Sequence, residues 1–174
     1  MNVFVSGGAK NGKSTFAENI ARDMAHEKGL PLYYVATMIP HDKEDEDRIH
    51  RHVLSRAGKG FKTIEQGKHI LDVLSEFQGV FLVDSVTALL SNEMFREDGY
   101  CDYAAGERVR EDLIKFAEKG KNVVFVSDYI YSEASHFEDL TEEYRKSLAG
   151  IDRALAQTCD KVYEASFGQI KEWK

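Results

Sequence analysis

One short segment near the start of the chain constrains its fold more than any other feature. Residues 7–14 read Gly-Gly-Ala-Lys-Asn-Gly-Lys-Ser, which fits the phosphate-binding pattern G-x-x-x-x-G-K-[ST]. An apolar run at residues 3–5 precedes this segment, and apolar residues at helical steps of four follow it: Phe16, Ile20 and Met24. A strand, a glycine-rich loop and a helix in this order predict a nucleotide-binding α/β fold rather than a chance glycine-rich turn.

Each residue type in this loop has a physical reason to be there. Glycines permit positive φ and let backbone N–H groups approach phosphate oxygens, and the following helix N-terminus adds partial positive charge. The Lys13 ammonium can reach the β- and γ-phosphates, and the Ser14 hydroxyl can ligate Mg²⁺. We therefore expect the whole segment to bind a nucleoside triphosphate, through Gly7, Gly8, Ala9, Lys10, Asn11, Gly12, Lys13 and Ser14.

The rest of the chain alternates between apolar runs of strand length and longer segments of helical period. The runs at 32–36, 80–83 and 123–126 lack polar alternation, which is typical of central parallel strands buried on both faces. We predict helices over 12–28, 69–77, 102–118 and 141–158, and closing strands around Val162 and Ile170. Residues 40–67 are the most polar and the least regular. The pattern predicts a mostly parallel sheet flanked by helices.

Composition narrows the class of protein. The 174 residues are 43% hydrophobic, which is enough for one domain over residues 1–174 with a substantial core. The net charge of −7 argues against nucleic-acid and anionic-membrane binding. No apolar run approaches the roughly 18 residues of a membrane span, and the first residues lack the features of a secretory signal. We expect a cytoplasmic protein.

Asp84 is a candidate carboxylate for the metal site. It follows the apolar run 80–83, so it should lie at the carboxyl end of a central strand, where an acid approaches the Mg²⁺ shell. Capping of the next helix is the structural alternative, since Asp84, Ser85 and Thr87 all suit an N-cap. The two interpretations are compatible.

The polar stretch carries two histidines. Residues 42–47 are nearly all acidic, as in the first turn of an exposed helix. His50 and His52 would point in different directions on that helix, which argues against a two-histidine metal site. A histidine flanked by arginines, with Arg56 one turn beyond, can instead attack a phosphorus atom. Spacing alone favours exposed histidines on a polar helix.

Taken in order, the motifs of this chain resemble those of one family. It is the bifunctional adenosylcobinamide kinase and adenosylcobinamide-phosphate guanylyltransferase family of cobalamin biosynthesis. The motifs are the loop at 7–14, Ala36-Thr37 after an apolar run, Arg48-Ile49-x-x-His52-x-x-x-Arg56, Thr63-x-Glu65, Asp84-Ser85-Val86-Thr87, and Asn92. They extend over nearly the whole chain.

This resemblance implies a P-loop NTPase fold, a homotrimer with active sites shared between neighbours, and two reactions. The family phosphorylates adenosylcobinamide with ATP or GTP, and then transfers GMP from GTP to that phosphate through a GMP-histidine intermediate. By motif position the catalytic histidine is His52. The resemblance also implies further nucleotide contacts from Ala36, Thr37, Met38, Arg56, Glu65 and Asp84, with Ser14 and Asp84 at Mg²⁺.

The chain departs from the family pattern on the acceptor side. An Asn-Glu-Val-Gly block of the family is replaced by Asp128-Tyr129-Ile130-Tyr131, and a later asparagine by Asp152. The two tyrosines either pack on a large corrinoid or fill a gap in the core. Two other functions stay open: a P-loop small-molecule kinase of the same lineage with another acceptor, and a nucleotide-dependent switch or regulatory ATPase.

Overall fold

The computed structural model describes residues 1–96, 98–132 and 137–174, which form a sheet between two layers of helices. The strands are β1 (Val3–Gly7), β2 (Leu32–Ala36), β3 (Lys62–Glu65), β4 (Val80–Asp84), β5 (Val123–Asp128), β6 (Lys161–Ser166) and β7 (Gln169–Glu172). The α-helices are α1 (Lys13–Lys28), α2 (Lys43–Arg56), α3 (Val73–Glu76), α4 (Val86–Met94), α5 (Ala105–Gly120) and α6 (Asp139–Thr158). Two short 3₁₀ turns are η1 (Ile70–Asp72) and η2 (Ile130–Ser132).

The strand order brings distant parts of the sequence together. The order is β3-β2-β4-β5-β1-β6-β7, and every pair is parallel except β6 with β7. The predicted α/β fold with a mostly parallel sheet is therefore confirmed. Because β5 lies between β4 and β1, the end of β5 separates Asp84 from the glycine-rich loop.

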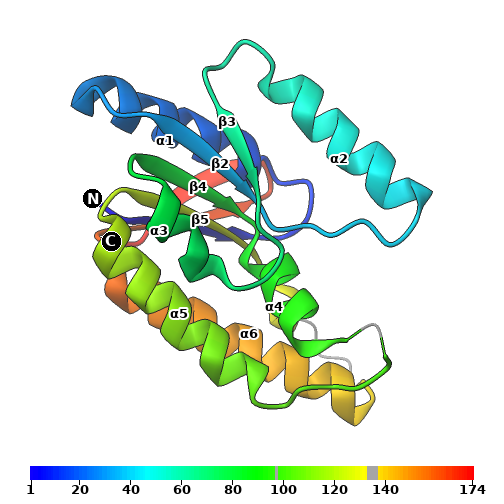
Figure 1. The fold of residues 1–174 in the computed structure, drawn as a ribbon. Helices are drawn as coiled ribbons and strands as arrows, with labels where there is room; N and C mark the ends of the chain where they lie inside the picture. The colour runs from blue at the N-terminus through cyan, green and yellow to red at the C-terminus, as the bar shows by residue number, and fades with distance from the viewer. Residues whose placement is uncertain (97, 133–136) are drawn as a thin grey trace.

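Helices cover both faces of the sheet (Figure 1), and apolar side chains pack them against it. Alternate residues such as Val5, Leu82 and Val126 pack with α1 on one face. The intervening residues, such as Phe81 and Phe125, pack with α4, α5 and α6 on the other. The central strands are thus buried on both faces, as their continuous apolar runs predict. In the parts of the chain that the structure describes, no helix is long and apolar enough to cross a membrane.

Residues 40–67 are more regular than their sequence indicates. They contain α2, whose Asp42 side chain caps it by accepting a hydrogen bond from Asp45 N at 2.9 Å, and the edge strand β3. Figure 1 shows α2 set apart from the other helices. The acidic run at 42–47 indicated an exposed helix, whose full length lacked a signal because a helix that covers no core needs no apolar stripe. The mostly exposed edge strand β3 needs no apolar alternation, so it left no sequence signal.

Two other helical segments differ from the prediction. The helix expected over 69–77 is the turn η1 followed by the single-turn α3. Helix α4 starts directly after β4, and its N-cap is Ser85, whose hydroxyl accepts a hydrogen bond from Ala88 N at 3.2 Å. The cap is therefore not Asp84, whose carboxylate is directed elsewhere.

Candidate nucleotide-binding site

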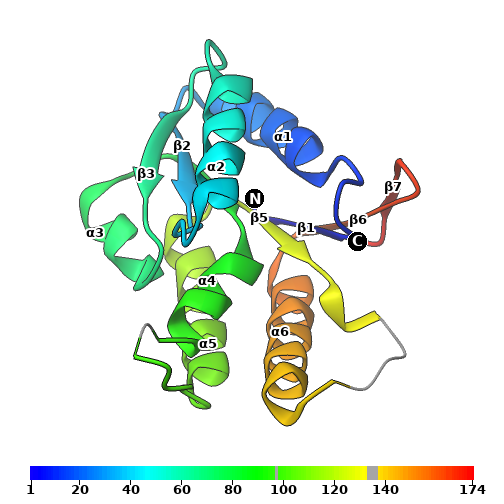
Figure 2. The same ribbon diagram turned by 90° about the vertical axis from the view of Figure 1, so that its right-hand side faces the viewer.

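The glycine-rich loop joins the carboxyl end of β1 to the N-terminus of α1, at the edge of the sheet that faces the viewer in Figure 2. Gly12 precedes the helix with φ 85°, a conformation that glycine adopts without strain. Among the described residues, no side chain caps the first turn of α1, so no cap pairs the free backbone N–H groups of this turn. Such a turn attracts anions because its N–H dipoles add up at that end.

Lys13 is buried rather than a surface lysine. Its side chain is 6% exposed, and Nζ donates a hydrogen bond to Gly8 O at 2.7 Å. The same ammonium lies 2.7 Å from Oδ1 of Asp128, at the end of β5. The backbone N–H of Asp128 donates in turn to Thr87 Oγ1 at 2.8 Å. One carbonyl and one carboxylate therefore fix the position of the Lys13 ammonium beside the loop.

Asp84 lies at the carboxyl end of β4 and is half-buried. Its Oδ2 accepts a hydrogen bond from the Tyr34 hydroxyl at 2.9 Å. Burial, and then the neighbouring Asp84, raise the pKa of Tyr34, so the phenol stays protonated and donates. This bond orients the carboxylate at the same edge of the sheet as the loop.

The residues at this edge fit a magnesium ion that binds together with a nucleotide. Asp84 shares its sheet face with Leu82, which packs with α1, and Ser14 is the second residue of that helix. One carboxylate and one hydroxyl suffice for Mg²⁺, which takes its other ligands from phosphates and water. Over the described residues, no group of three or more His, Cys, Asp or Glu side chains is arranged to hold a metal by itself.

Arg56 ends α2 and joins the same cluster. Its side chain is 6% exposed, and its guanidinium lies 3.3 Å from the centroid of the Tyr34 ring. Two of its nitrogens, Nε and Nη1, are buried without a hydrogen-bond partner among the described residues. An unpaired buried charge is costly, so an anion that reached these nitrogens would be stabilised.

His52 lies one turn before Arg56 and is half-buried, whereas His50 is exposed. Neither imidazole hydrogen-bonds to another described side chain, and the side chain of Arg48 lies outside the described part of the structure. Figure 2 shows α2 on the same side of the sheet as the glycine-rich loop. The structure thus brings the helix of His52 to this edge without a hydrogen bond between the described His52 side chain and the loop.

The ends of three neighbouring strands hold most of the remaining predicted residues. Ala36 pairs with Glu65 on one side and with Asp84 on the other. Thr37 is fully buried, and its hydroxyl donates to Ser85 O and accepts from Ser85 N, both at 2.7 Å. Those bonds occupy the hydroxyl, so the structure assigns Thr37 to holding the strand end. Met38 follows it and is half-buried.

Asn92 supports the same strand end. Its Nδ2 donates to Thr37 O at 2.7 Å and to Gly67 O at 2.9 Å. The sequence marks this asparagine only through the family resemblance, because its partners are backbone carbonyls far away in the chain.

The block 128–131 does not act as one unit. Asp128 contacts Lys13, a pairing that sequence reasoning missed, although Asp128 ends an apolar run just as Asp84 does. Tyr131 packs against the core, and its hydroxyl donates to Asp152 Oδ2 at 2.8 Å, so this ring fills the core. Tyr129 stays half-buried beside Gly8 of the loop.

Asp152 is a buried carboxylate beneath this site. It is 3% exposed, and its Oδ1 lacks a hydrogen bond of ordinary geometry to any described residue. Burial raises its pKa to about 6, although the nearby hydroxyls of Ser127 and Tyr131 lower it. At a given pH near 5 or 6, a larger fraction of the Asp152 carboxyl group is therefore protonated than in an exposed aspartate.

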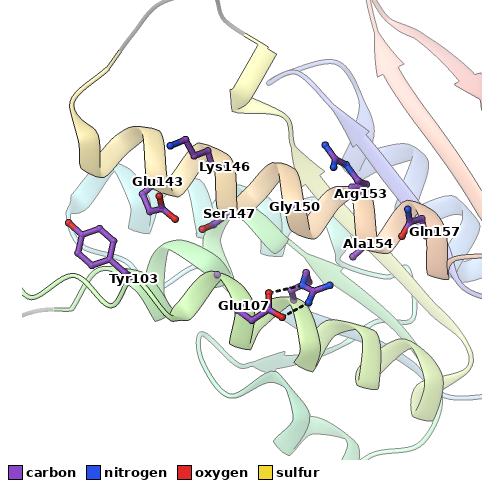
Figure 3. Close-up of a pocket in the computed structure, with 11 residues that line it drawn as sticks. Tyr103, Glu107, Glu143, Lys146, Ser147, Gly150, Arg153, Ala154 and Gln157 are labelled. Carbon is purple, nitrogen blue, oxygen red and sulfur yellow. Dashed lines mark hydrogen bonds and ion pairs between the residues drawn. The ribbon is translucent and has the colours of Figure 1, made fainter.

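A separate cavity of about 470 Å³ lies between α5 and α6 (Figure 3). Charged side chains such as Glu107, Arg110, Lys146 and Arg153 line it. None of the predicted nucleotide-site residues does.

Comparison with known proteins gives one family. The profile described as "CobU: Cobinamide kinase / cobinamide phosphate guanyltransferase" matches residues 3–172. A protein of Pseudomonas aeruginosa named "Bifunctional adenosylcobalamin biosynthesis protein CobP" is 28% identical over 166 residues, which cover 93% of this chain and 91% of that protein. The similarly named CobU of Salmonella typhimurium is 26% identical over 176 residues, which cover 94% of each chain.

Solved structures share the fold at low identity. The ATPase domain of G40P superposes with a TM-score of 0.52 at 12% identity, over 94% of this chain and 68% of that one. The PH0250 protein of Pyrococcus horikoshii gives 0.53 at 11% identity, over 99% and 85%. These likenesses concern the fold alone, and with the family match they confirm the predicted P-loop NTPase fold.

Proposed function

Because this chain belongs to the cobinamide kinase / cobinamide phosphate guanyltransferase family, we propose that it phosphorylates adenosylcobinamide and then transfers GMP from GTP to that phosphate. The observation that carries the proposal is the family match over residues 3–172, together with a lysine aimed along a complete phosphate-binding loop. The relatives in Pseudomonas aeruginosa and Salmonella typhimurium are named as bifunctional proteins of adenosylcobalamin biosynthesis.

In the first reaction, residues 7–14 hold the phosphates of ATP or GTP. The acceptor hydroxyl attacks the γ-phosphorus and loses its proton to water, the new O–P bond forms, and the bond from the γ-phosphorus to the bridging oxygen breaks, which releases ADP or GDP. Lys13 offsets the negative charge that grows on the leaving oxygen. Ser14 and Asp84 would hold Mg²⁺, which neutralises charge on the β- and γ-phosphates when it is bound.

In the second reaction, His52 is the nucleophile. Its neutral imidazole attacks the α-phosphorus of GTP and pyrophosphate leaves; the phosphate of the acceptor then attacks the GMP-histidine and restores the imidazole. The position of α2 at the loop edge and the half-buried state of His52 support this role. Arg56, whose Nε and Nη1 lack partners among the described residues, would offset charge at the α-phosphate. Ala36, Thr37, Met38 and Glu65 complete the nucleotide site, Thr37 by supporting its strand end.

We also propose a homotrimer that works in the cytoplasm, with residues 1–174 as a single nucleotide-binding and transferase domain. The family resemblance implies the trimer and the sharing of active sites. Val53 and Leu54 of α2 are 47% and 60% exposed, which a neighbouring subunit at this helix would reduce. Sedimentation equilibrium of the purified protein measures the assembly.

The direct experiment supplies adenosylcobinamide with Mg²⁺ and ATP, then adds GTP, and separates the products by chromatography. We expect adenosylcobinamide phosphate first and its GDP derivative after GTP is added. A GMP adduct without transfer to the corrinoid would keep the histidine chemistry and reject the acceptor, in favour of a related enzyme with another substrate. Nucleotide hydrolysis without any acceptor would favour a switch or regulatory ATPase.

A further inference from the structure

The hairpin of β6 and β7 ends beside the glycine-rich loop. Strand β6 runs parallel to β1, and Ala165 lies opposite Gly7, so both strands end at the same edge (Figures 1 and 2). The approach is close, because a Cβ built on Gly7 would lie 2.3 Å from Ala165 O. The hairpin turn begins two residues after Ala165, a distance of about 7 Å along an extended chain.

The first turn residue is Phe167, and its side chain is 97% exposed. Ser166 pairs with Gln169, which leaves a two-residue turn of Phe167 and Gly168, with φ of 51° and 71°. Such a turn favours Asn-Gly or Asp-Gly, because a bulky residue at positive φ is strained. Neither the turn geometry nor packing therefore explains an aromatic ring at this position.

Neighbouring aromatic rings on the same hairpin have partners. Tyr163 packs edge-on against Phe16 of α1, with ring centroids 5.0 Å apart. Trp173 donates from Nε1 to Glu164 at 2.9 Å and contacts the Lys171 ammonium. Phe167 has no ring or cation partner within the described residues. An exposed ring that the fold does not use is available to a ligand.

The positions of the other site residues indicate how a nucleotide bound at the loop would be oriented. Asp128 and Asp84 end β5 and β4, on one side of the loop strand β1. A triphosphate whose γ-phosphate and metal ion lie on that side extends its nucleoside toward the opposite side, where β6 and the hairpin lie. The flat base then reaches the hairpin tip.

We propose that Phe167 stacks on the base of the nucleoside triphosphate whose phosphates occupy residues 7–14. This rests on the proposed nucleotide site and extends it to the nucleoside end. Stacking uses the π-face that every base has, so the contact serves ATP and GTP alike. Base selection would then have to come from other residues.

The test compares Phe167→Asn with Phe167→Trp. Asparagine suits the turn and removes the ring, so we expect Phe167→Asn to raise Tm by about 1–3 °C. It should also raise the Kd for both ATP and GTP at least about fivefold, as loss of one base–aromatic stack predicts. Phe167→Trp should bind both nucleotides within about twofold of wild type, because it keeps an aromatic face. Tyr103→Ala, an exposed ring in the loop before α5, is the matched control and should change nothing.

Inorganic tripolyphosphate separates base stacking from damage to the loop. We expect its affinity to be the same in wild type and in Phe167→Asn, because it has no base. Unchanged ATP and GTP affinities in Phe167→Asn would overturn the proposal, and so would an equal loss for tripolyphosphate. The result is independent of the acceptor. If wild type transfers nothing to adenosylcobinamide, but Phe167→Asn still weakens the binding of ATP and GTP and not that of tripolyphosphate, the stacking proposal stands and the proposed function fails.

Discussion

The two segments that carry the proposed chemistry are built in opposite ways. The glycine-rich loop is backed by β1, β5 and β6, and its lysine is buried and held by Gly8 O and Asp128. Helix α2 is mostly exposed and is anchored near its end, by Arg56 on Tyr34 and by the Lys59–Glu18 ion pair of 2.6 Å. The phosphate site is therefore preorganised by the core, whereas the position of His52 depends on a few contacts at one end of a helix.

Of substitutions in these two segments, Lys13→Ala should have the largest effect, because it alters the glycine-rich loop, the preorganised segment. Loss of the ammonium should lower phosphoryl transfer at least about 100-fold, because the negative charge that grows on the leaving oxygen is then no longer offset by Lys13. Steady-state kinetics with ATP and Mg²⁺ measures this. Lys28→Ala is the control, since Lys28 is exposed at the far end of α1 and lies outside the predicted site. Equal activity of a folded Lys13→Ala protein would reject the loop as the site.

His52→Ala tests helix α2, the mostly exposed segment. We expect it to abolish labelling of the protein by α-labelled GTP and to leave phosphorylation of the acceptor within about threefold of wild type, because the two reactions use different nucleophiles. His50→Ala, on the same helix, should label normally. Peptide mapping of the wild-type adduct gives an independent answer, and label on His50 or Lys13 would contradict the assignment.

Arg56→Ala tests whether α2 depends on its anchor. Removing the guanidinium from the Tyr34 ring should lower the free energy of unfolding by about 1–2 kcal/mol and GMP labelling about tenfold. Chemical denaturation and the labelling assay measure the two effects. Arg51→Ala is the control, because Arg51 is exposed on the same helix. Full labelling by Arg56→Ala would mean that the anchor does not position His52.

Asp152→Asn is expected to have the smallest effect on activity and to change the pH dependence of stability. The pKa of Asp152 is about 6 in the folded chain, against 3.8 for an aspartate free of these surroundings, so the folded state binds more protons than the unfolded state between these values. Its contribution to stability therefore falls as pH rises from about 4 to above 6. At pH 7 we expect Asp152→Asn to be about 1–3 kcal/mol more stable, because the amide still accepts from Tyr131 without a buried charge.

Denaturation of both proteins at pH 5 and pH 7.5 checks the sign. The difference between Asp152→Asn and wild type should grow with pH. Asp23→Asn, an exposed aspartate on α1, should show no such trend. A difference that shrinks with pH would mean that the carboxylate is stabilised, rather than penalised, by its surroundings.

Local patterns in the sequence were sufficient for the central strands, for α1 and for the phosphate-binding loop. Buried parallel strands read as continuous apolar runs, and a glycine before a lysine and a serine marks the loop, because both depend on neighbouring residues only. The position of Asp84 after an apolar run made it a candidate, the family motifs favoured roles for His52 and Arg56, and the family match confirms that resemblance. The roles of these residues stay predictions.

Only the tertiary structure decided which distant residues meet. Because β5 lies between β4 and β1, Lys13 forms its ion pair with Asp128 at the end of β5. Asp84, at the end of β4, instead accepts a hydrogen bond from Tyr34. The packing of α6 places Asp152 where its carboxylate accepts a hydrogen bond from the Tyr131 hydroxyl, so Tyr131 packs in the core rather than on a ligand. No local pattern carries this information, because strand order and helix docking minimise the free energy of the whole core. The residues that meet as a result are separated by 21 to 115 positions along the chain.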